Sequence, residues 1–218
     1  VKIWREMGAE SGRLMGEVFG EENRGKEKGL EDVRGRIMRA GNSLFSGKGY
    51  YETTQEDIID LAGISLGEFH QHYSDKEDLL LDLAEEGVRI FRRRVSEEIA
   101  AVPDMLERIR IAIPVAFQVI VENREIYTLF LEDSVLSDAP YERKLSQIMS
   151  IITNDLRATI SRGIKEGSIR KLHPDIAAYA IIGQLVRLAN YWMEDPMKHN
   201  MEEITREAVE FVTRALKP

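Results

Sequence analysis

Several hydrogen-bonding side chains fall within one short predicted helix, which begins at Ser65 and ends near His72. A short helix that presents such groups to the edges of base pairs is the recognition element of many DNA-binding proteins. The residues that we expect on this recognition face are Ser65, Leu66, Gly67, Glu68, His70 and Gln71. Without a partner, the same residues would form an ordinary exposed helix.

Residues suited to catalysis or metal binding are scattered in this sequence. The chain has no cysteine, and its four histidines are His70, His72, His173 and His199. His70 and His72 lie two residues apart, which places them on different faces of a helix and disfavours a shared metal ion. The sequence contains no glycine-rich phosphate loop and no Ser/His/Asp grouping. We therefore expect a binding protein that is not an enzyme and that needs no cofactor or metal.

A pair of short helices must position the recognition face. Thr53 and Thr54 are N-cap candidates for the first helix, and Glu56 follows Thr53 at the spacing of a capping box. That helix ends at Gly63, and Ser65 caps the second. Small residues at the corner allow the helices to cross steeply, as in a helix-turn-helix. Thr53 and Thr54 could then offer hydroxyl and backbone N–H groups to a phosphate at the N-terminus of the first helix.

The segment from Arg36 to Leu80, RIMRAGNSLFSGKGYYETTQEDIIDLAGISLGEFHQHYSDKEDLL, resembles the N-terminal domain of the TetR (tetracycline-repressor) family nearly position by position. The resemblance implies a DNA-binding helix-turn-helix in which Lys76 steadies the contact with the DNA backbone and Tyr73 is buried. The positions that match the family's spacing are 40–45 at the end of the first helix, Gly49, Tyr50, Thr53, Thr54, Ile58, Ala62, Gly63, Ile64, Ser65, Gly67, Tyr73, Lys76, Glu77 and Leu79.

The same segment departs from the family in residue type and in charge. His70 stands where the family usually has a tyrosine, and Glu68 stands where a small hydroxyl residue is common. From Leu30 to Leu80 five basic residues oppose ten acidic ones, although affinity for DNA usually rests on phosphate neutralisation. Glu68 could accept a hydrogen bond from the N4 amine of cytosine, or it could repel the duplex.

The segment from Ile111 to Val121 is apolar on nearly every side, which predicts a buried helix that Pro114 bends. Members of the TetR family often hold a small hydrophobic or amphipathic molecule among the helices of this region, and aromatic walls suit such a pocket. The same residues would serve as plain core packing, and Gln118 as a hydrogen-bonded core amide. The candidate ligand-binding residues are Phe117, Gln118, Tyr127, Phe130, Leu131 and Asn154.

The last two predicted helices, at 174–192 and 201–215, suit an interface between two subunits. In the first of them, Ala177, Ala180 and Gly183 would allow close approach of another helix. Two helices from each subunit would form a four-helix interface and place the two recognition helices about 34–36 Å apart, or a multiple of that spacing. The apolar stripe of the final helix consists of Ile204, Ala208, Phe211, Val212 and Ala215.

Long stretches with a 3.6-residue period, without alternating strand segments, predict an all-α chain. The expected domains are an extra N-terminal helix and linker (1–29), a helix-turn-helix DNA-binding domain (30–78), and a helical effector-binding and dimerisation domain (79–218). The net charge is −8, and neither a leader nor an apolar run of about 18 residues is visible. We therefore expect a cytoplasmic protein without a membrane partner.

These observations predict a one-component transcriptional regulator, a repressor that binds a palindromic operator in double-stranded DNA as a homodimer. A small hydrophobic or amphipathic effector would release it. The alternative is a helical dimeric binding module that has lost DNA binding and recognises a protein or small-molecule partner. Binding to duplex DNA that weakens with salt separates the two.

Overall fold

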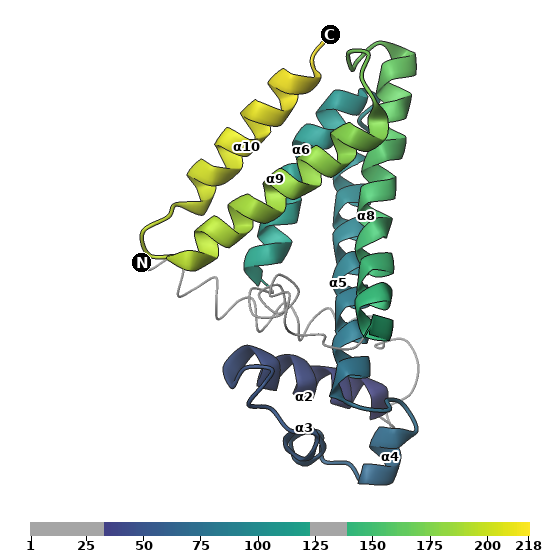
Figure 1. Cartoon of the computed structure of the whole chain (residues 1–218), viewed down its shortest axis with the longest axis vertical. Coiled ribbons are helices and arrows are strands. Elements are labelled where there is room, and N and C mark those ends of the chain that lie inside the picture. The colour runs from purple at the N-terminus through teal and green to yellow at the C-terminus, as the bar shows by residue number, and fades with distance from the viewer. Residues whose placement is uncertain (1–32, 123–138) are drawn as a thin grey trace. The chain divides into compact units, whose positions relative to one another are not determined.

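The computed structural model describes residues 33–122 and 139–218 of the chain (Figure 1). Every regular element in these residues is a helix, which confirms the all-α prediction. The extra N-terminal helix expected within residues 1–29 lies outside the described residues. The helices are α2 (Val33–Gly47), α3 (Gln55–Ala62), α4 (Leu66–His70), α5 (Lys76–Ile99), α6 (Met105–Glu122), α8 (Ala139–Glu166), α9 (Pro174–Glu194) and α10 (Met201–Leu216).

The chain divides into two compact units, the first ending at Leu80 and the second beginning at Leu81. In the first unit α2 packs on α3, and both contribute to one small core. Tyr73 is buried in that unit, as the resemblance implied. The buried residues of the unit are Ile37, Met38, Ala40, Phe45, Tyr50, Ile58, Ala62, Phe69, Tyr73, Leu79 and Leu80.

Two capping boxes begin the short helices of the first unit. Thr54 is the N-cap of α3, where its hydroxyl accepts from the Asp57 amide and the Asp57 carboxylate accepts from the Thr54 amide. The capping box expected from Thr53 and Glu56 is therefore wrong by one position. Gly63 ends α3 with φ of 61°, a left-handed conformation that glycine adopts without a steric penalty.

The second unit packs α6 against α8 and α10, and α8 against α9. In α6 the residues Met105, Ile109, Ile113 and Phe117 point into one core. Pro114 lies on the exposed side of the same helix. The core also takes residues from α8, α9 and α10, namely Ile160, Ala178, Ile181, Leu185, Ala189, Trp192, Met201, Ile204, Ala208, Val212 and Leu216. None of the described helices is long and apolar enough to cross a membrane.

Candidate nucleic-acid interface and ligand cavity

The structure places the predicted recognition face on α4 and its flanking residues. Ser65, Leu66, Gly67, His70 and Gln71 are exposed, and Leu66 exposes 54% of its surface. Phe69 is fully buried and anchors α4 to the core of the first unit. The expected residues therefore share one accessible surface, apart from Glu68, which is half-buried.

Glu68 has a structural role that the sequence analysis did not consider. Its Oε2 accepts hydrogen bonds from the Ser65 amide at 2.8 Å and from the Ser65 hydroxyl at 2.7 Å. The Ser65 hydroxyl oxygen in turn accepts from the Glu68 amide at 3.2 Å. These hydrogen bonds, led by the one from the Ser65 backbone, lower the pKa of Glu68. The Ser-x-x-Glu spacing of this capping box was visible in the sequence.

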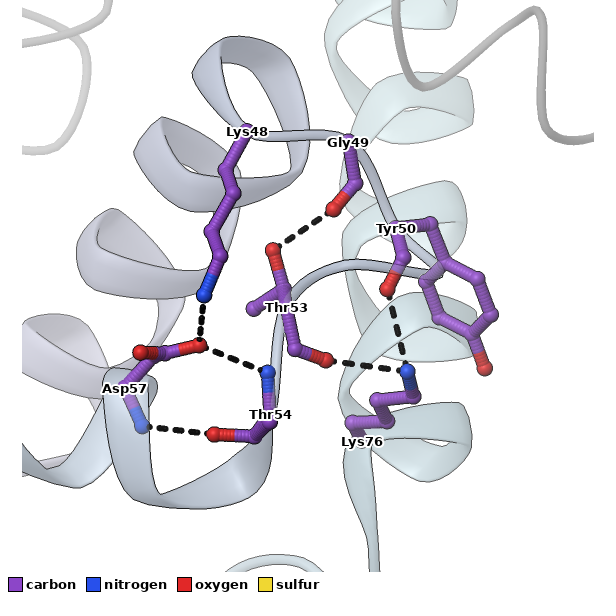
Figure 2. Close-up of polar contacts among 7 residues, drawn as sticks. All are labelled: Lys48, Gly49, Tyr50, Thr53, Thr54, Asp57 and Lys76. Carbon is purple, nitrogen blue, oxygen red and sulfur yellow. Dashed lines mark hydrogen bonds and ion pairs between the residues drawn. The ribbon is translucent and has the colours of Figure 1, made fainter.

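Thr53 and Thr54, expected to face a phosphate together, differ in exposure, and Figure 2 shows their hydrogen bonds. The Thr53 side chain is fully buried, and its hydroxyl donates to the Gly49 carbonyl at 2.6 Å. Its hydroxyl is therefore turned away from solvent, where a phosphate would lie. Thr54 is exposed, and its hydroxyl keeps a proton to donate while its oxygen caps α3.

Lys76 closes the turn between α2 and α3 (Figure 2). Its Nζ donates to the Tyr50 carbonyl at 3.0 Å and to the Thr53 carbonyl at 2.9 Å, and it lies 4.3 Å from the centroid of the Tyr50 ring. The Tyr50 hydroxyl donates to Glu77 Oε1 at 2.7 Å. Burial, assisted by this carboxylate, raises the pKa of Tyr50. The contacts of Lys76 within the chain are therefore structural, and a contact with the DNA backbone stays a prediction.

The other basic residues between 33 and 80, the part of the first unit that the structure describes, also have partners within the chain. Arg36 Nη1 donates to the Ala62 and Gly63 carbonyls, at 3.3 and 3.2 Å, and so caps the C-terminus of α3. Lys48 forms an ion pair with Asp57, and this hydrogen bond is the main reason that the pKa of Asp57 falls to about 2. Arg34 and Arg39 also interact with other groups of the chain. Arg36, Lys48 and Lys76 therefore stabilise the unit itself.

A cavity of about 370 Å³ lies in the second unit among α5, α6, α8 and α9. This volume falls in the range of small-molecule sites, about 300–1,000 Å³. An ion pair between Arg92 Nε and Asp155 Oδ2, at 2.8 Å, lies in its wall, and Arg108 adds a second cation. The lining residues are Phe91, Arg92, Val95, Ser96, Ile99, Arg108, Ile109, Ala112, Ile113, Ala116, Ile152, Asp155, Leu156, Ala158, Thr159, Ile181, Ile182 and Leu185.

The predicted ligand-binding residues that the structure describes do not line this cavity. Phe117 is 1% exposed and belongs to the core. Gln118 is exposed and donates to Glu122 Oε1 at 3.1 Å, so the core-amide interpretation is wrong, while a ligand contact of Gln118 stays a prediction. Asn154 is also exposed. The remaining three candidates, Tyr127, Phe130 and Leu131, lie outside the described residues.

The cavity could have been located from small residues of α6. Ala112 and Ala116 are four residues apart and therefore share a helix face, with Ile109 and Ile113 beside them. Short side chains on this face leave space that a larger residue would fill. The aromatic residue of the same helix, Phe117, is the more conspicuous signal, but it packs into the core.

The helices expected at the subunit interface expose one apolar surface on α9. Ile176 and Tyr179 expose 68% and 70% of their surfaces. We call the exposed residues that share this side of the helix the α9 face: Ile176, Tyr179, Ala180, Gly183 and Arg187. In α10, by contrast, Ile204, Ala208 and Val212 are buried in the core of the unit, and of the predicted stripe only Phe211 and Ala215 are exposed.

Comparison with known proteins relates most of the chain to bacterial regulators. The HTH-type transcriptional activator FasR of Mycolicibacterium smegmatis is 22% identical over 192 residues, covering 88% of this chain and 86% of that protein. The fatty acid metabolism regulator protein of Bacillus subtilis is 20% identical over 182 residues, covering 83% of this chain and 94% of that protein.

Solved structures share the fold. The transcriptional regulator FadR from Bacillus subtilis, in complex with stearoyl-CoA, has a TM-score of 0.74 at 20% identity and covers 83% of this chain and 98% of that chain. A TetR-family regulator from Syntrophomonas wolfei has a TM-score of 0.73 at 25% identity, with coverage of 83% and 92%.

Family models match both units of the chain. The model of the tetR family of bacterial regulatory proteins matches residues 37–83, which hold the helix-turn-helix. The model of the tetracyclin repressor-like C-terminal domain matches residues 103–216, more than half of the chain. The chain therefore belongs to the TetR family of transcriptional regulators.

Proposed function

We propose that this regulator is a repressor that inserts α4 into the major groove of a palindromic operator. The observation that carries the proposal is the open backbone at Gly67, in the middle of the exposed recognition face. A Cβ at Gly67 would meet only the Ser65 hydroxyl oxygen, at 3.9 Å, so packing within the chain does not require a glycine there. Glycine costs a helix about 1 kcal/mol relative to alanine, and close approach of a duplex is a physical reason for its use.

The α9 face supports a homodimer as the DNA-binding form. Its exposed apolar residues run along one side of a 21-residue helix, and an α-helix with such a side buries it against a partner. Gly183 lies in this face, and no atom would contact a Cβ built there. A second copy of α9, packed across the same face by a two-fold axis, would bury these residues and present two copies of α4 to a palindrome.

The cavity of the second unit supports a ligand with a long apolar part and an anionic head. Aliphatic side chains of four helices form most of its wall, while Arg92 is paired with Asp155 and Arg108 adds a further positive charge. The related FadR was solved in complex with stearoyl-CoA. We propose that a fatty acyl thioester or a fatty acid enters this cavity and releases the protein from DNA.

Release requires that the ligand prefer one state of the protein over the other. A coupling of about 1–3 kcal/mol between ligand and DNA is typical of such regulators and corresponds to about 5-fold to 150-fold in operator affinity. The proposed ligand would favour the arrangement of the dimer whose two recognition helices no longer fit successive major grooves.

The test is binding of the purified full chain to duplex DNA from the region upstream of its own gene, and to a scrambled duplex, at two salt concentrations. We expect the native chain to prefer the upstream duplex and Gln71→Ala to lose that preference. The control Gln147→Ala, which changes an exposed glutamine of α8, should keep it. Addition of stearoyl-CoA should weaken binding. Equal affinity for both duplexes would refute operator recognition, and unchanged affinity with stearoyl-CoA bound would refute the release mechanism.

One observation favours a second candidate function, a protein-binding module. Between Leu30 and Leu80 the chain carries ten acidic residues, and the five basic residues of that segment are engaged within the chain. Such a unit would attract a basic protein surface. Failure to bind either duplex at low salt, where phosphate attraction is strongest, would select this alternative.

A further inference from the structure

The recognition face differs chemically from a helix that binds guanine. The major-groove edge of guanine presents two acceptors, N7 and O6, which arginine or lysine usually binds. The sequence from Ser65 to Gln71 contains neither. It carries instead one exposed leucine and one carboxylate.

Two other polar side chains of the recognition face, those of Ser65 and His70, are partly engaged within the unit. His70 Nδ1 lies 3.3 Å from the Tyr73 carbonyl, which can only accept, so this nitrogen donates. His70 Nε2 then accepts from the side-chain amide nitrogen Nε2 of Gln55 at 3.4 Å. The Ser65 hydroxyl donates to Glu68. His70 and Ser65 therefore have few donors left for guanine.

Leu66 is the apolar group at the end of α4 that meets base edges. It is the first residue after the N-cap, and the N-terminal residues of a recognition helix contact the bases. More than half of its surface is exposed. The C5 methyl of thymine is the apolar group of the major groove and makes contact with apolar side chains. Burying Leu66 against that methyl would remove apolar surface of both molecules from water.

Glu68 offers a fixed acceptor in the same first turn of α4, two residues after Leu66. Both hydrogen bonds from Ser65 go to Oε2, so Oε1 accepts neither of them. The capping box holds the carboxylate in place, and a carboxylate beside the groove accepts from the N4 amine of cytosine while it repels the acceptors of guanine.

We propose that α4 recognises its half-site through the methyl group of a thymine, contacted by Leu66, and the N4 amine of a cytosine, accepted by Glu68 Oε1, without binding a guanine N7–O6 edge. This assignment rests on the proposed entry of α4 into the major groove and specifies which bases it would select there.

The experiment begins with selection from a pool of random duplexes by the purified full chain. In the enriched duplex each thymine is then replaced by uracil, which lacks only the methyl group, and each guanine by 7-deazaguanine, which lacks N7. We expect one thymine per half-site whose replacement weakens binding about fourfold, the value of one buried methylene-sized group. We expect no loss from any 7-deazaguanine.

A double-mutant cycle assigns the thymine to Leu66. Leu66→Ala should weaken binding to the thymine duplex and show no further loss with uracil at the same position. The matched control is Leu61→Ala, which removes an equally exposed leucine of α3 and should keep the full difference between thymine and uracil. Persistence of that difference in Leu66→Ala would overturn the assignment.

Glu68→Gln tests the cytosine contact without removing the cap, because glutamine also serves at the third position of a capping box. At the cytosine position the native chain should prefer cytosine over adenine at least tenfold. An amide both donates and accepts hydrogen bonds, so Glu68→Gln should bind the duplex with adenine at that position as tightly as the duplex with cytosine. Unchanged preference, or a loss from 7-deazaguanine, would overturn the proposal. A selection that enriches no sequence would instead overturn the proposed function, and the base assignment with it.

Discussion

Charged residues of the first unit stabilise its own turns. Arg36 and Lys76 each donate to two backbone carbonyls, and Lys48 holds the carboxylate that caps α3. Carbonyls at helix ends and turns have no partner in the regular hydrogen-bond pattern, so a cation there replaces the water that folding removes. These contacts explain how a small unit with a net negative charge stays folded.

Replacing Lys76 by methionine tests its role in the α2–α3 turn. Lys76→Met leaves the Tyr50 and Thr53 carbonyls without this donor, and we expect the free energy of unfolding to fall by about 1–2 kcal/mol. Urea denaturation followed by circular dichroism measures it. Lys165→Met, which changes an exposed lysine of α8, should change stability by less than about 0.5 kcal/mol. Equal stability of the two variants would show that the carbonyl contacts are dispensable.

Asp57 should contribute to stability in a defined pH range. Its pKa falls from 3.8 to about 2 in the folded chain, so the ionised carboxylate stabilises the fold above about pH 4 and loses this effect as the pH falls through about 2. Asp57→Asn lacks the effect, so the stability difference between native chain and variant should shrink from pH 5 to pH 2. Thermal unfolding across that range tests it. Asp60→Asn, at an exposed aspartate of the same helix, is the control.

At the level of elements, the ends of helices could be predicted from the sequence, because local signals determine them. α2 ends in glycines, Gly63 ends α3, and Ser65 begins α4, because caps and turns depend on residues close in the chain. Thr53 and Thr54 are equally good caps by residue type, so the sequence could not choose between them. The choice depends on Gly49, whose carbonyl takes the Thr53 hydroxyl.

The sequence could not predict which helix faces meet. The apolar stripe of α10 was recognised, but Ala208 and Val212 belong to the core of their own chain, whereas the sequence analysis assigned them to a subunit interface. Likewise α6 is apolar on most sides, so periodicity alone could not separate the side of Phe117 from the side of Ala112 and Ala116. Such assignments depend on tertiary contacts that a single sequence does not display.

Gly67 should show opposite effects on folding and on DNA binding. Gly67→Ala meets no crowding within the chain, so we expect up to about 1 kcal/mol more stability from helix propensity. The added methyl would lie where α4 approaches the duplex, so operator affinity should fall severalfold. Denaturation and fluorescence anisotropy measure the two effects. Gly87→Ala, in α5 and equally uncrowded, should give the gain in stability alone, and equal DNA affinity in both variants would exclude close approach at Gly67.

At the scale of the molecule, ligand entry should depend on the space between the small residues of α6. Ala116→Phe would fill part of the 370 Å³ cavity and should weaken stearoyl-CoA binding at least tenfold, while the protein stays on DNA when ligand is added. Overpacking costs up to about 3 kcal/mol where no space exists, so a smaller loss of stability would itself indicate an open cavity. Ala101→Phe, at an exposed position outside the cavity wall, should bind the ligand as the native chain does.

The α9 face should hold two chains together. Tyr179 exposes 70% of its surface there. In a dimer built on this face, Tyr179→Glu would place the new carboxylate opposite its own symmetry mate. Burying a charge without a partner of opposite charge costs several kcal/mol. Sedimentation equilibrium should give twice the 24.9 kDa chain mass for the native protein and the single mass for the variant. Tyr51→Glu, at an exposed tyrosine of the first unit, should remain dimeric. Because a monomer occupies one half-site, Tyr179→Glu should bind a full palindrome no more tightly than half of one. A dimeric Tyr179→Glu would place the interface elsewhere.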